Sequence, residues 1–364
     1  MDRFSEKYNS APVAFNFDDL ILLPGFSETR PRDIDLATRF SKSIRIRNPF
    51  VSSPMDMVTE SAMAIAMAES GGIGVVHRNC TAEDEVRMVR AVKEAEPKSA
   101  TATLGSDKRL AVAAGISPFD LERAKALAEY ADALMVDVAH FHTKGTLEAT
   151  GKIISAVDID VVIGSLGTKE GTLGSLRALE GAAGLRCGIG GGSICITTDV
   201  TKAGSPTLFA TAQAADAREE LGSDIPIIAD GGIRSPGDMA LAFAFGADSV
   251  MLGYGVAGTD ESPGGIVEVN GRKFKPYRGM GSKGARERRA VVDRYADSGR
   301  RKMEEGIEGL IPYKGSVSDV IELISSGVRA SIGYAGAGSI AEMRTKARIA
   351  RIFQRTQKAG IVTK

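Results

Sequence analysis

The sequence predicts a (β/α)8 TIM barrel, an α/β fold in which eight parallel strands alternate with helices. Short β-branched or apolar runs recur along the 364 residues, and each is followed by apolar residues at helical spacing. These runs start roughly 20–40 residues apart, as a barrel requires. Glycine-rich turns follow the sixth, seventh and eighth runs, where barrels commonly build phosphate sites. A doubly wound parallel sheet is the alternative, and the position of the glycine-rich turns favours the barrel.

Eight segments have the apolar composition of buried parallel strands. They are residues 50–55, 72–77, 111–116, 133–138, 160–165, 184–189, 226–232 and 249–254. Three of the intervening segments have clear helical features. Residues 60–70 are rich in Ala and Met, residues 118–130 open with Pro118 at an early helical position, and residues 236–245 follow Ser235, a candidate N-cap.

Two segments interrupt this alternation, and we interpret both as excursions from one catalytic domain that spans residues 1–364. Residues 92–107 are a short polar link that contains Pro97. Residues 264–314 contain glycine-rich turns and an Arg-rich stretch. Their length predicts a mobile flap or lid, whereas their charge alone is also typical of a solvated surface helix. The basic tail, residues 344–364, is expected to form an exposed closing helix.

The composition argues against several classes of protein. The 46 Lys and Arg residues balance 46 Asp and Glu residues, so we expect neither nucleic acid nor an anionic membrane as a partner. No apolar run reaches the roughly 18 residues of a membrane span. Three cysteines without C-x-x-C spacing, and no apolar leader in residues 1–12, predict a cytoplasmic protein without disulfides.

The strongest candidate for chemistry is the motif GIGGGSICITT at residues 188–198, directly after the sixth predicted strand. Clustered glycines let the backbone approach a ligand, and Ser193 adds a hydroxyl that can bind phosphate. The thiolate of Cys195 can attack an electron-poor carbon. A buried, unreactive cysteine is the alternative, and we favour it for Cys80 and Cys187 because no glycine cluster surrounds them.

Two further glycine-rich turns extend the expected phosphate site. The motifs ADGGIR at 229–234 and GYG at 253–255 follow the seventh and eighth predicted strands. Backbone N–H groups of Gly232 and Gly253 can bind phosphate, whereas the Asp230 carboxylate suits a ribose diol. The glycines at 188 and 190 lack the acidic partner of a dinucleotide-binding fingerprint.

The three histidines, His77, His140 and His142, show no zinc-ligand spacing with cysteines or carboxylates. His140 and His142 follow the fourth predicted strand. They either face the barrel mouth or belong to its core or rim.

Seven blocks in order along the chain resemble the family of inosine-5′-monophosphate (IMP) dehydrogenase and, more distantly, guanosine-5′-monophosphate (GMP) reductase. They are FDDLILLP (17–24), VSSPMD (51–56), GGIGVVHRNC (71–80), GGGSICIT (190–197), ADGGIR (229–234), YRGMGS (277–282) and EGIEG (305–309). The resemblance implies a homotetramer or octamer that oxidises IMP to xanthosine monophosphate (XMP) with NAD⁺, in guanine nucleotide biosynthesis. Cys195 matches the nucleophile, which attacks purine C2. Hydride then leaves to the nicotinamide, and water hydrolyses the covalent thioimidate.

The resemblance also assigns expected roles to individual residues. The expected catalytic residues are Cys195, Thr197, Arg294 and Tyr295. The expected substrate-binding residues are Ser53, Met55, Arg186, Ser193, Asp230, Gly231, Gly232, Gly253, Tyr254, Tyr277, Gly279, Met280, Gly281 and Glu305. The residues expected beside the cofactor are Asp137, His140, Ser165, Gly188 and Gly190. The backbone carbonyls of Gly190, Gly192 and Cys195 match a potassium site that the neighbouring subunit completes.

The pair Arg294 and Tyr295 matches the part of the family flap that activates the hydrolytic water. The reductase, which deaminates GMP with NADPH, lacks this pair. General-base catalysis contributes typically 10²–10⁴-fold, so the presence of the pair favours the dehydrogenase. Glu305 offers a second route to water.

The chain also departs from the family pattern. A tandem regulatory nucleotide-binding module is usual after the second βα unit, and residues 92–103 contain only the short polar link, so regulation through that module is expected to be absent. Ser165 replaces a usual Asn, Tyr254 replaces a usual serine beside the phosphate, and residues 204–207 read GSPT instead of Gly-x-Pro-Gln. GMP reductase and a non-catalytic nucleotide-binding paralogue therefore remain as alternatives.

Overall fold

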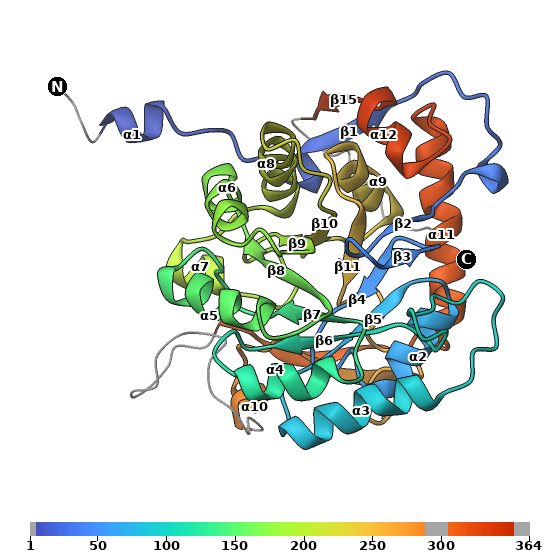
Figure 1. The fold of residues 1–364 in the computed structure, drawn as a ribbon. Helices are drawn as coiled ribbons and strands as arrows, with labels where there is room; N and C mark the ends of the chain where they lie inside the picture. The colour runs from blue at the N-terminus through green and yellow to red at the C-terminus, as the bar shows by residue number, and fades with distance from the viewer. Residues whose placement is uncertain (1–4, 288–304, 353–364) are drawn as a thin grey trace.

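The computed structural model describes residues 5–287 and 305–352, and its central feature is a closed barrel of eight parallel strands (Figure 1). The order of strands around the barrel is β10-β11-β4-β5-β6-β7-β8-β9. These strands are β4 (Phe50–Ser52), β5 (Ile73–Val76), β6 (Val112–Ile116), β7 (Ala133–Val136), β8 (Asp160–Leu166), β9 (Gly184–Cys187), β10 (Ile227–Asp230) and β11 (Ser249–Leu252). All eight lie within the predicted strand segments or one residue beyond them, so the barrel is confirmed.

A helix follows each barrel strand and covers the outside of the sheet (Figure 1). These helices are α2 (Ser61–Glu69), α3 (Ala82–Glu94), α4 (Leu121–Ala128), α5 (Lys144–Ile154), α6 (Lys169–Ala178), α8 (Thr207–Glu220), α9 (Pro236–Ala244) and α11 (Val317–Tyr334). Helix α9 begins with the predicted cap: the Ser235 hydroxyl accepts from Asp238 N–H, and the Asp238 carboxylate accepts from Ser235 N–H.

Apolar side chains fill the barrel interior. Val51, Ile73, Met135 and Met251 belong to one buried cluster inside the sheet, as expected for parallel strands covered on both faces. A short hairpin, β2 (Thr38–Arg39) and β3 (Arg45–Ile46), adds Phe40 and Ile46 to this cluster. Its turn contacts the start of β8, because Ser43 Oγ donates to Asp160 at 2.6 Å. The hairpin therefore closes the amino end of the barrel and leaves the carboxyl end for the site.

The N-terminal segment is tied to the end of the described chain. It comprises α1 (Ser5–Asn9), the 3₁₀ turns η1 (Phe17–Asp19) and η2 (Pro31–Asp33), and β1 (Leu20–Leu23). Strand β1 pairs antiparallel with β15 (Arg348–Arg351), which follows α12 (Ile340–Lys346). Phe17 is 1% exposed and packs in the core beneath this pair.

The described residues of the second excursion contain a small antiparallel sheet, and most of the Arg-rich stretch, for which a surface helix was the alternative, lies outside the described residues. This sheet contains β12 (Val267–Val269), β13 (Arg272–Arg278) and β14 (Glu308–Pro312), with α10 (Lys283–Glu287) after β13. Arg278 fastens it to the barrel, because its Nη2 donates to Asp56 after β4 at 2.5 Å. The mobility predicted for residues 264–314 stays a prediction, and residues 288–304 lie outside the described residues.

Three sequence predictions about elements are wrong in detail. Helix α4 begins at Leu121 rather than at Pro118, because Asp120 is the N-cap and accepts from Arg123 N–H. The first residues of the predicted link at 92–107 belong to α3, which ends at Glu94. The basic tail is not a single helix, because residues after α12 form β15, whose pairing with β1 satisfies backbone groups that a helix would use internally.

Candidate active site

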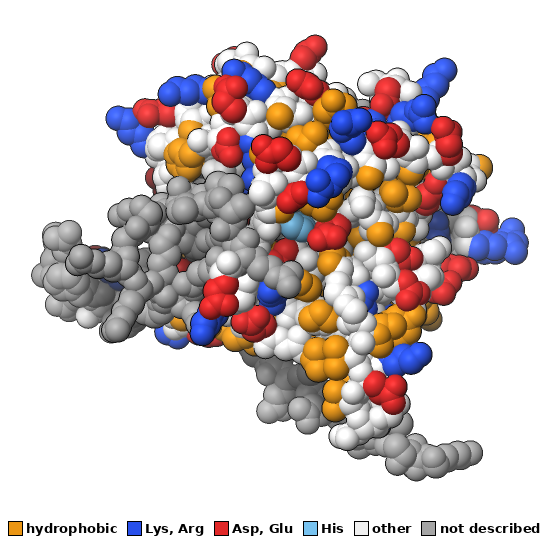
Figure 2. All heavy atoms as spheres, turned by 90° about the horizontal axis from the view of Figure 1, so that it is seen from below, with side chains coloured by type: hydrophobic (Ala, Val, Ile, Leu, Met, Phe, Trp, Pro, Cys, Tyr) orange, Lys and Arg blue, Asp and Glu red, His pale blue; other side chains and the backbone are white. Residues whose placement is uncertain are grey.

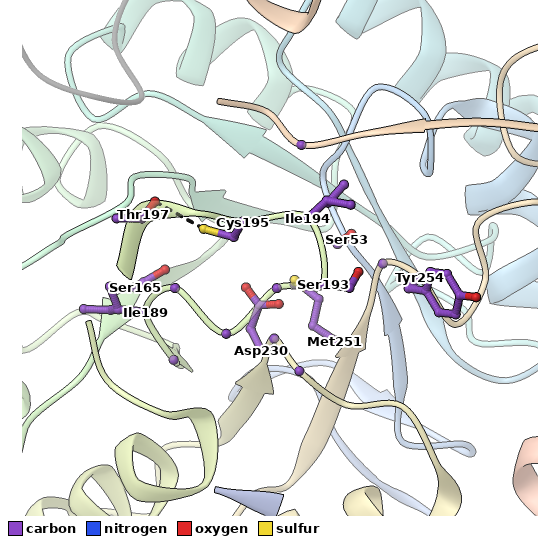
Figure 3. A pocket seen from close by; sticks show the side chains of 18 of the residues that line it. Ser53, Ser165, Ile189, Ser193, Ile194, Cys195, Thr197, Asp230, Met251 and Tyr254 are labelled. Atoms are coloured by element: carbon purple, nitrogen blue, oxygen red, sulfur yellow. Dashed lines mark hydrogen bonds between the residues drawn. The ribbon is translucent and has the colours of Figure 1, made fainter. Parts of the chain in front are cut away.

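A cavity of about 450 Å³ opens at the carboxyl ends of the barrel strands, within the size range of small-molecule sites. It is lined by residues that follow β4, β9, β10 and β11, and by residues 279–281 and Glu305 of the excursion. Figure 3 shows Ser193, Cys195 and Asp230 around it. Enzymes with this fold place their active sites at this end of the barrel.

Cys195 lies in the loop between β9 and α7 (Thr197–Thr201) and takes part in a chain of two hydrogen bonds. Its Sγ donates to Thr197 Oγ1 at 3.2 Å, drawn as a dashed line in Figure 3, and Thr197 Oγ1 donates to Glu305 Oε2 at 2.8 Å. A carboxylate at the end of such a chain can draw the proton from the thiol. The arrangement therefore has the parts of an activated nucleophile.

Backbone pairing fixes the Cys195 loop against the excursion. Cys195 and Gly306 form an antiparallel bridge, and two hydrogen bonds of 3.1 Å join residues 194–196 to residues 305–307. Gly279 N–H donates to the carbonyl of Ile307 at 2.9 Å. Glu305 is therefore brought to Cys195 by main-chain contacts, although the two residues lie far apart in the sequence.

Two glycines of the cavity wall cannot carry a side chain. Gly188 has a φ of +122°, and a Cβ there would lie 2.1 Å from the carbonyl oxygen of Asp230. Gly232 has a φ of +69°, and a Cβ there would lie 2.9 Å from the carbonyl oxygen of Gly191. The loops after β9 and β10 therefore pack backbone against backbone and leave their polar groups beside the cavity.

Polar side chains converge on Gly253 at one end of the cavity. A Cβ on Gly253 would lie 3.0 Å from Tyr277 Oη, 3.2 Å from Ser53 Oγ and 3.3 Å from Met55 Sδ. The buried Ser53 Oγ has no hydrogen-bond partner within the described part of the chain, which is typical of a group that a ligand completes. Burial raises the pKa of Tyr277 to about 12, against the lowering effect of its hydrogen bond with Ser193. Tyr277 is therefore a protonated hydroxyl that can donate.

A chain of alternating charges extends from the cavity wall into the barrel. Arg186 is 1% exposed; its Nη1 donates to Asp230 at 3.0 Å and its Nη2 to Asp137 at 3.4 Å. Arg78 extends the chain, because its Nε lies 3.7 Å from Asp137 Oδ2. Burying these charges is tolerable only because each has an opposite partner. The Asp230 carboxylate is thereby held in place at the cavity wall.

Most of the predicted site residues lie together. All fourteen residues expected to bind substrate line the cavity, as do Cys195, Thr197, Ser165, Gly188, Gly190 and Gly192. Asp137 and His140 follow β7 but do not line it: Asp137 is buried beside Arg186, and His140 is exposed. Arg294 and Tyr295 lie outside the described residues. The roles assigned to all of these residues stay predictions.

Two lining residues that received no predicted role are Asp18 and Arg234, whose side chains form an ion pair. Asn16, Pro54, Ala139, Ile189, Gly191, Ile194, Ile233 and Met251 also line the cavity without having been predicted. Asp18 lies in the block FDDLILLP and Arg234 in ADGGIR, so the sequence contained a signal for both, but not for their contact. The N-terminal segment thus supplies part of the wall.

The expected potassium ligands have suitable chemistry. Among the described residues no group donates a hydrogen bond to the carbonyl oxygens of Gly190 or Cys195, and the carbonyl of Gly192 accepts from Cys195 N–H at 3.1 Å. Backbone carbonyl oxygens are ligands that hard cations prefer. These residues therefore fit a monovalent cation.

The other two cysteines have different surroundings. Burial raises the pKa of the Cys187 thiol to about 12. Burial and then the Glu85 carboxylate raise the pKa of Cys80 to about 12, against the lowering effect of Arg123. Both thiols stay protonated at neutral pH, which makes them poor nucleophiles.

The surface has no dominant charge on the face shown in Figure 2, where Lys and Arg side chains mix with Asp and Glu. In the described ranges, no three His, Cys, Asp or Glu side chains group as a metal site would require. The helices within those ranges are all too short or too polar to cross a membrane.

Comparison with known proteins agrees with this geometry. The model of the IMP dehydrogenase / GMP reductase domain matches residues 14–362. The chain is 38% identical to an inosine-5′-monophosphate dehydrogenase of Korarchaeum cryptofilum, over 93% of this chain and 94% of the relative. It is 35% identical to the enzyme of that name from Methanocaldococcus jannaschii (95% and 94% covered) and 38% identical to that from Cryptosporidium parvum (91% and 90% covered).

The alignments also show a difference in length. The alignments with the two archaeal proteins run over 450 and 470 positions, which is more than the 364 residues of this chain. The alignment with the Cryptosporidium protein runs over 364 positions. The archaeal relatives therefore contain residues without a counterpart here. The matches nevertheless cover the barrel, the glycine-rich loops and the excursion, and the chain belongs to the IMP dehydrogenase / GMP reductase family.

Proposed function

We propose that this protein is an IMP dehydrogenase, an oxidoreductase that converts IMP to XMP with NAD⁺ in guanine nucleotide biosynthesis. The observation that carries the proposal is the Cys195–Thr197–Glu305 chain beside a cavity of about 450 Å³. Membership of the family and the names of the relatives support the same activity. We expect a cytoplasmic homotetramer or octamer without the tandem regulatory module.

In this proposal, IMP lies with its phosphate near Gly232, Gly253 and Tyr277, its ribose beside Asp230, and its base near Met280. Cys195 Sγ adds to C2 of the base, and its proton passes through Thr197 to the Glu305 carboxylate. NAD⁺, when bound, accepts the hydride that leaves C2. Ser165 would lie beside the bound cofactor, and Arg186 would lie between substrate and cofactor, a role supported by its buried Nε, which has no partner in the described structure.

Hydrolysis of the thioimidate needs a base that activates water. Once Glu305 has released the thiol proton to solvent, its carboxylate can accept the proton of water through the Thr197 hydroxyl, and Arg294 with Tyr295 is the other expected route. Attack by water at C2 then forms XMP and returns the thiol to Cys195. The backbone carbonyls of Gly190, Gly192 and Cys195 would hold K⁺, and a cation there would supply a positive charge that links the backbone of the nucleophile loop.

The test is formation of NADH from IMP and NAD⁺ in the presence of K⁺. We expect Cys195→Ala to abolish turnover and to leave IMP binding measurable by calorimetry, because the thiol takes part in the chemistry. Cys80→Ala is the matched control and should retain turnover. Release of ammonia from GMP with NADPH, without NADH from IMP, would show a reductase. IMP binding without turnover in either direction would show a non-catalytic paralogue.

A further inference from the structure

Lys314 contacts the loop that follows β11, on the side away from the cavity. Its Nζ donates to the carbonyl oxygens of Tyr254 and Gly255, the latter at 3.2 Å. The same Nζ lies 4.5 Å from the centre of the Tyr254 ring, which adds a cation–π attraction. The chain thus has an ammonium group behind residues 253–255, the turn that we expect to bind phosphate.

The Lys314 ammonium has no carboxylate partner in the described structure. The two acidic residues of the neighbouring loop are engaged elsewhere: Asp260 Oδ1 accepts from Tyr313 Oη at 2.6 Å, and Glu261 Oε2 accepts from Val317 N–H at 2.8 Å. Burial lowers the pKa of Lys314 to about 8, and no neighbouring charge contributes to that shift. A partly buried cation without a counter-charge is costly, so a bound anion is the missing partner that this site would favour.

Residues 253–255 are oriented so that the positive charge of Lys314 favours an anion in the cavity. Two of their carbonyls face Lys314, whereas the N–H groups of residues 253–255 donate to no acceptor among the described residues. Consecutive free N–H groups form an anion-binding concavity. The Tyr254 ring packs edge to face on Tyr277, with centroids 6.1 Å apart, and both rings line the cavity. In Figure 3, Tyr254 lies with Ser193 on the side of the site opposite Thr197.

We propose that Lys314 is a positioning residue for the phosphate of the bound nucleotide. Its ammonium holds the 253–255 turn by two carbonyls, and its charge balances the phosphate dianion without contact. This inference rests on the proposed function, because it takes the ligand to be a nucleoside 5′-monophosphate. It adds a residue that lies outside the cavity wall and therefore outside the expected set of ligand contacts.

The test compares three ligands by isothermal titration calorimetry: IMP, ribose 5-phosphate and inosine. For Lys314→Met we expect affinity for IMP and ribose 5-phosphate to fall about tenfold, and affinity for inosine, which has no phosphate, to stay unchanged. Lys314→Arg keeps the charge and should restore most of the affinity. Lys273→Met, which removes an exposed lysine from β13, is the matched control and should leave all three unchanged. Equal weakening of inosine would overturn the proposal.

A pH titration of the unaltered protein gives a second test that does not depend on the folding of a variant. Ribose 5-phosphate has no ionisable base, and its phosphate is a dianion above about pH 7 because its second pKa is about 6. As pH rises through 8 to 9, Lys314 loses its charge, and affinity for ribose 5-phosphate should fall severalfold. An affinity that does not change over this range would contradict the proposal.

The surrounding segments contain other ionisable side chains, namely Tyr254, Tyr313, Asp260, Glu261, Lys273 and Lys275, and none of them contributes to the shift of the Lys314 pKa. Lys275 donates to carbonyls of residues 259–262 and its pKa is also lowered by burial, so the Lys314→Met profile is needed to separate the two lysines. Repeating the titration with Cys195→Ala removes the cavity thiol as a source of pH dependence. The same titration with Lys314→Met should give an affinity for ribose 5-phosphate that does not change with pH. A protein that binds no IMP at all would refute the proposed function, whereas IMP binding that is insensitive to Lys314 would refute this inference alone.

Discussion

Two oxygen atoms, of Thr197 and Glu305, distinguish the surroundings of Cys195 from those of the other two cysteines. Cys80 and Cys187 have thiol pKa values raised to about 12 by burial, whereas the Cys195 thiol donates to Thr197, whose hydroxyl in turn donates to Glu305. The same residue type thus has a buried or shielded thiol at two positions and, at the third, a thiol hydrogen-bonded toward a carboxylate, which is the position that we propose as the nucleophile. Only the surroundings of the sulfur distinguish them.

Thr197→Val should break the hydrogen-bond chain between the Cys195 thiol and the Glu305 carboxylate. Valine has a similar volume but no hydroxyl, so we expect kcat to fall about 10²-fold, the lower range for loss of general-base catalysis. Affinity for IMP should change little. The measurements are steady-state NADH formation and calorimetry with IMP.

Thr201→Val is the matched control for this prediction. Thr201 lies on the same helix, and its hydroxyl donates to the carbonyl of Thr197 without reaching Cys195. We expect its kcat to stay within about twofold of the unaltered value, as for most substitutions away from a site. If Thr197→Val also kept full turnover, the carboxylate would not act through this hydroxyl.

The segments that flank β13 and β14 hold Glu305 against the Cys195 loop through backbone contacts. A Cβ on Gly279 would lie 2.9 Å from the carbonyl oxygen of Ile194 and 3.2 Å from Gly306 Cα. Gly279→Ala should therefore push the Cys195 loop away from Glu305. A misplacement of about 1 Å can cost 10²-fold in rate, so we expect a loss of that order in kcat.

Gly309→Ala is the control within the same sheet. A Cβ at this position on β14 has open space around it, with no atom within 4 Å, and we expect unchanged kcat. Both variants are assayed for NADH formation and for unfolding in urea. Equal activity of the two variants would show that the spacing between these loops does not limit catalysis.

The sequence predicted the barrel elements well because buried parallel strands consist of short apolar runs, a pattern that depends on nearby residues alone. It did not predict the strands of the excursion, since β13 and β14 pair although they are far apart along the chain, and a local window does not indicate that contact. The strand at residues 348–351 was missed for the same reason: its partner is β1, and nothing in a local window indicates that contact.

At the scale of the whole molecule, the N-terminal segment is held by one buried aromatic ring and the β1–β15 pair. Phe17 is 1% exposed, whereas Phe26, nine residues further along, is 85% exposed. Phe17→Ala should lower the free energy of unfolding by about 3–5 kcal/mol, measured by urea denaturation. Phe26→Ala should change it by less than about 0.5 kcal/mol; equal effects would show that this segment does not pack as described.

The sequence predicted most of the residues that line the cavity but not the contacts that hold them in place. The glycine-rich motifs and the resemblance identified most of the residues that line the cavity. They did not reveal that Asp18 pairs with Arg234, that Asp137 is covered by two arginines, or that Lys314 lies behind Tyr254. Each of these contacts joins segments that fold together only in the complete barrel.

The pairing of β1 with β15 joins two segments from opposite ends of the described chain. Arg348 donates to the carbonyl of Pro24, 324 positions earlier in the chain, and contacts of such long range form slowly. All eight barrel strands precede residue 348, so during synthesis they emerge before the strand that pairs with β1. A chain shortened before residue 348 should therefore hold the wall that contains Asn16 and Asp18 only through the Phe17 core contact and the Asp18–Arg234 ion pair.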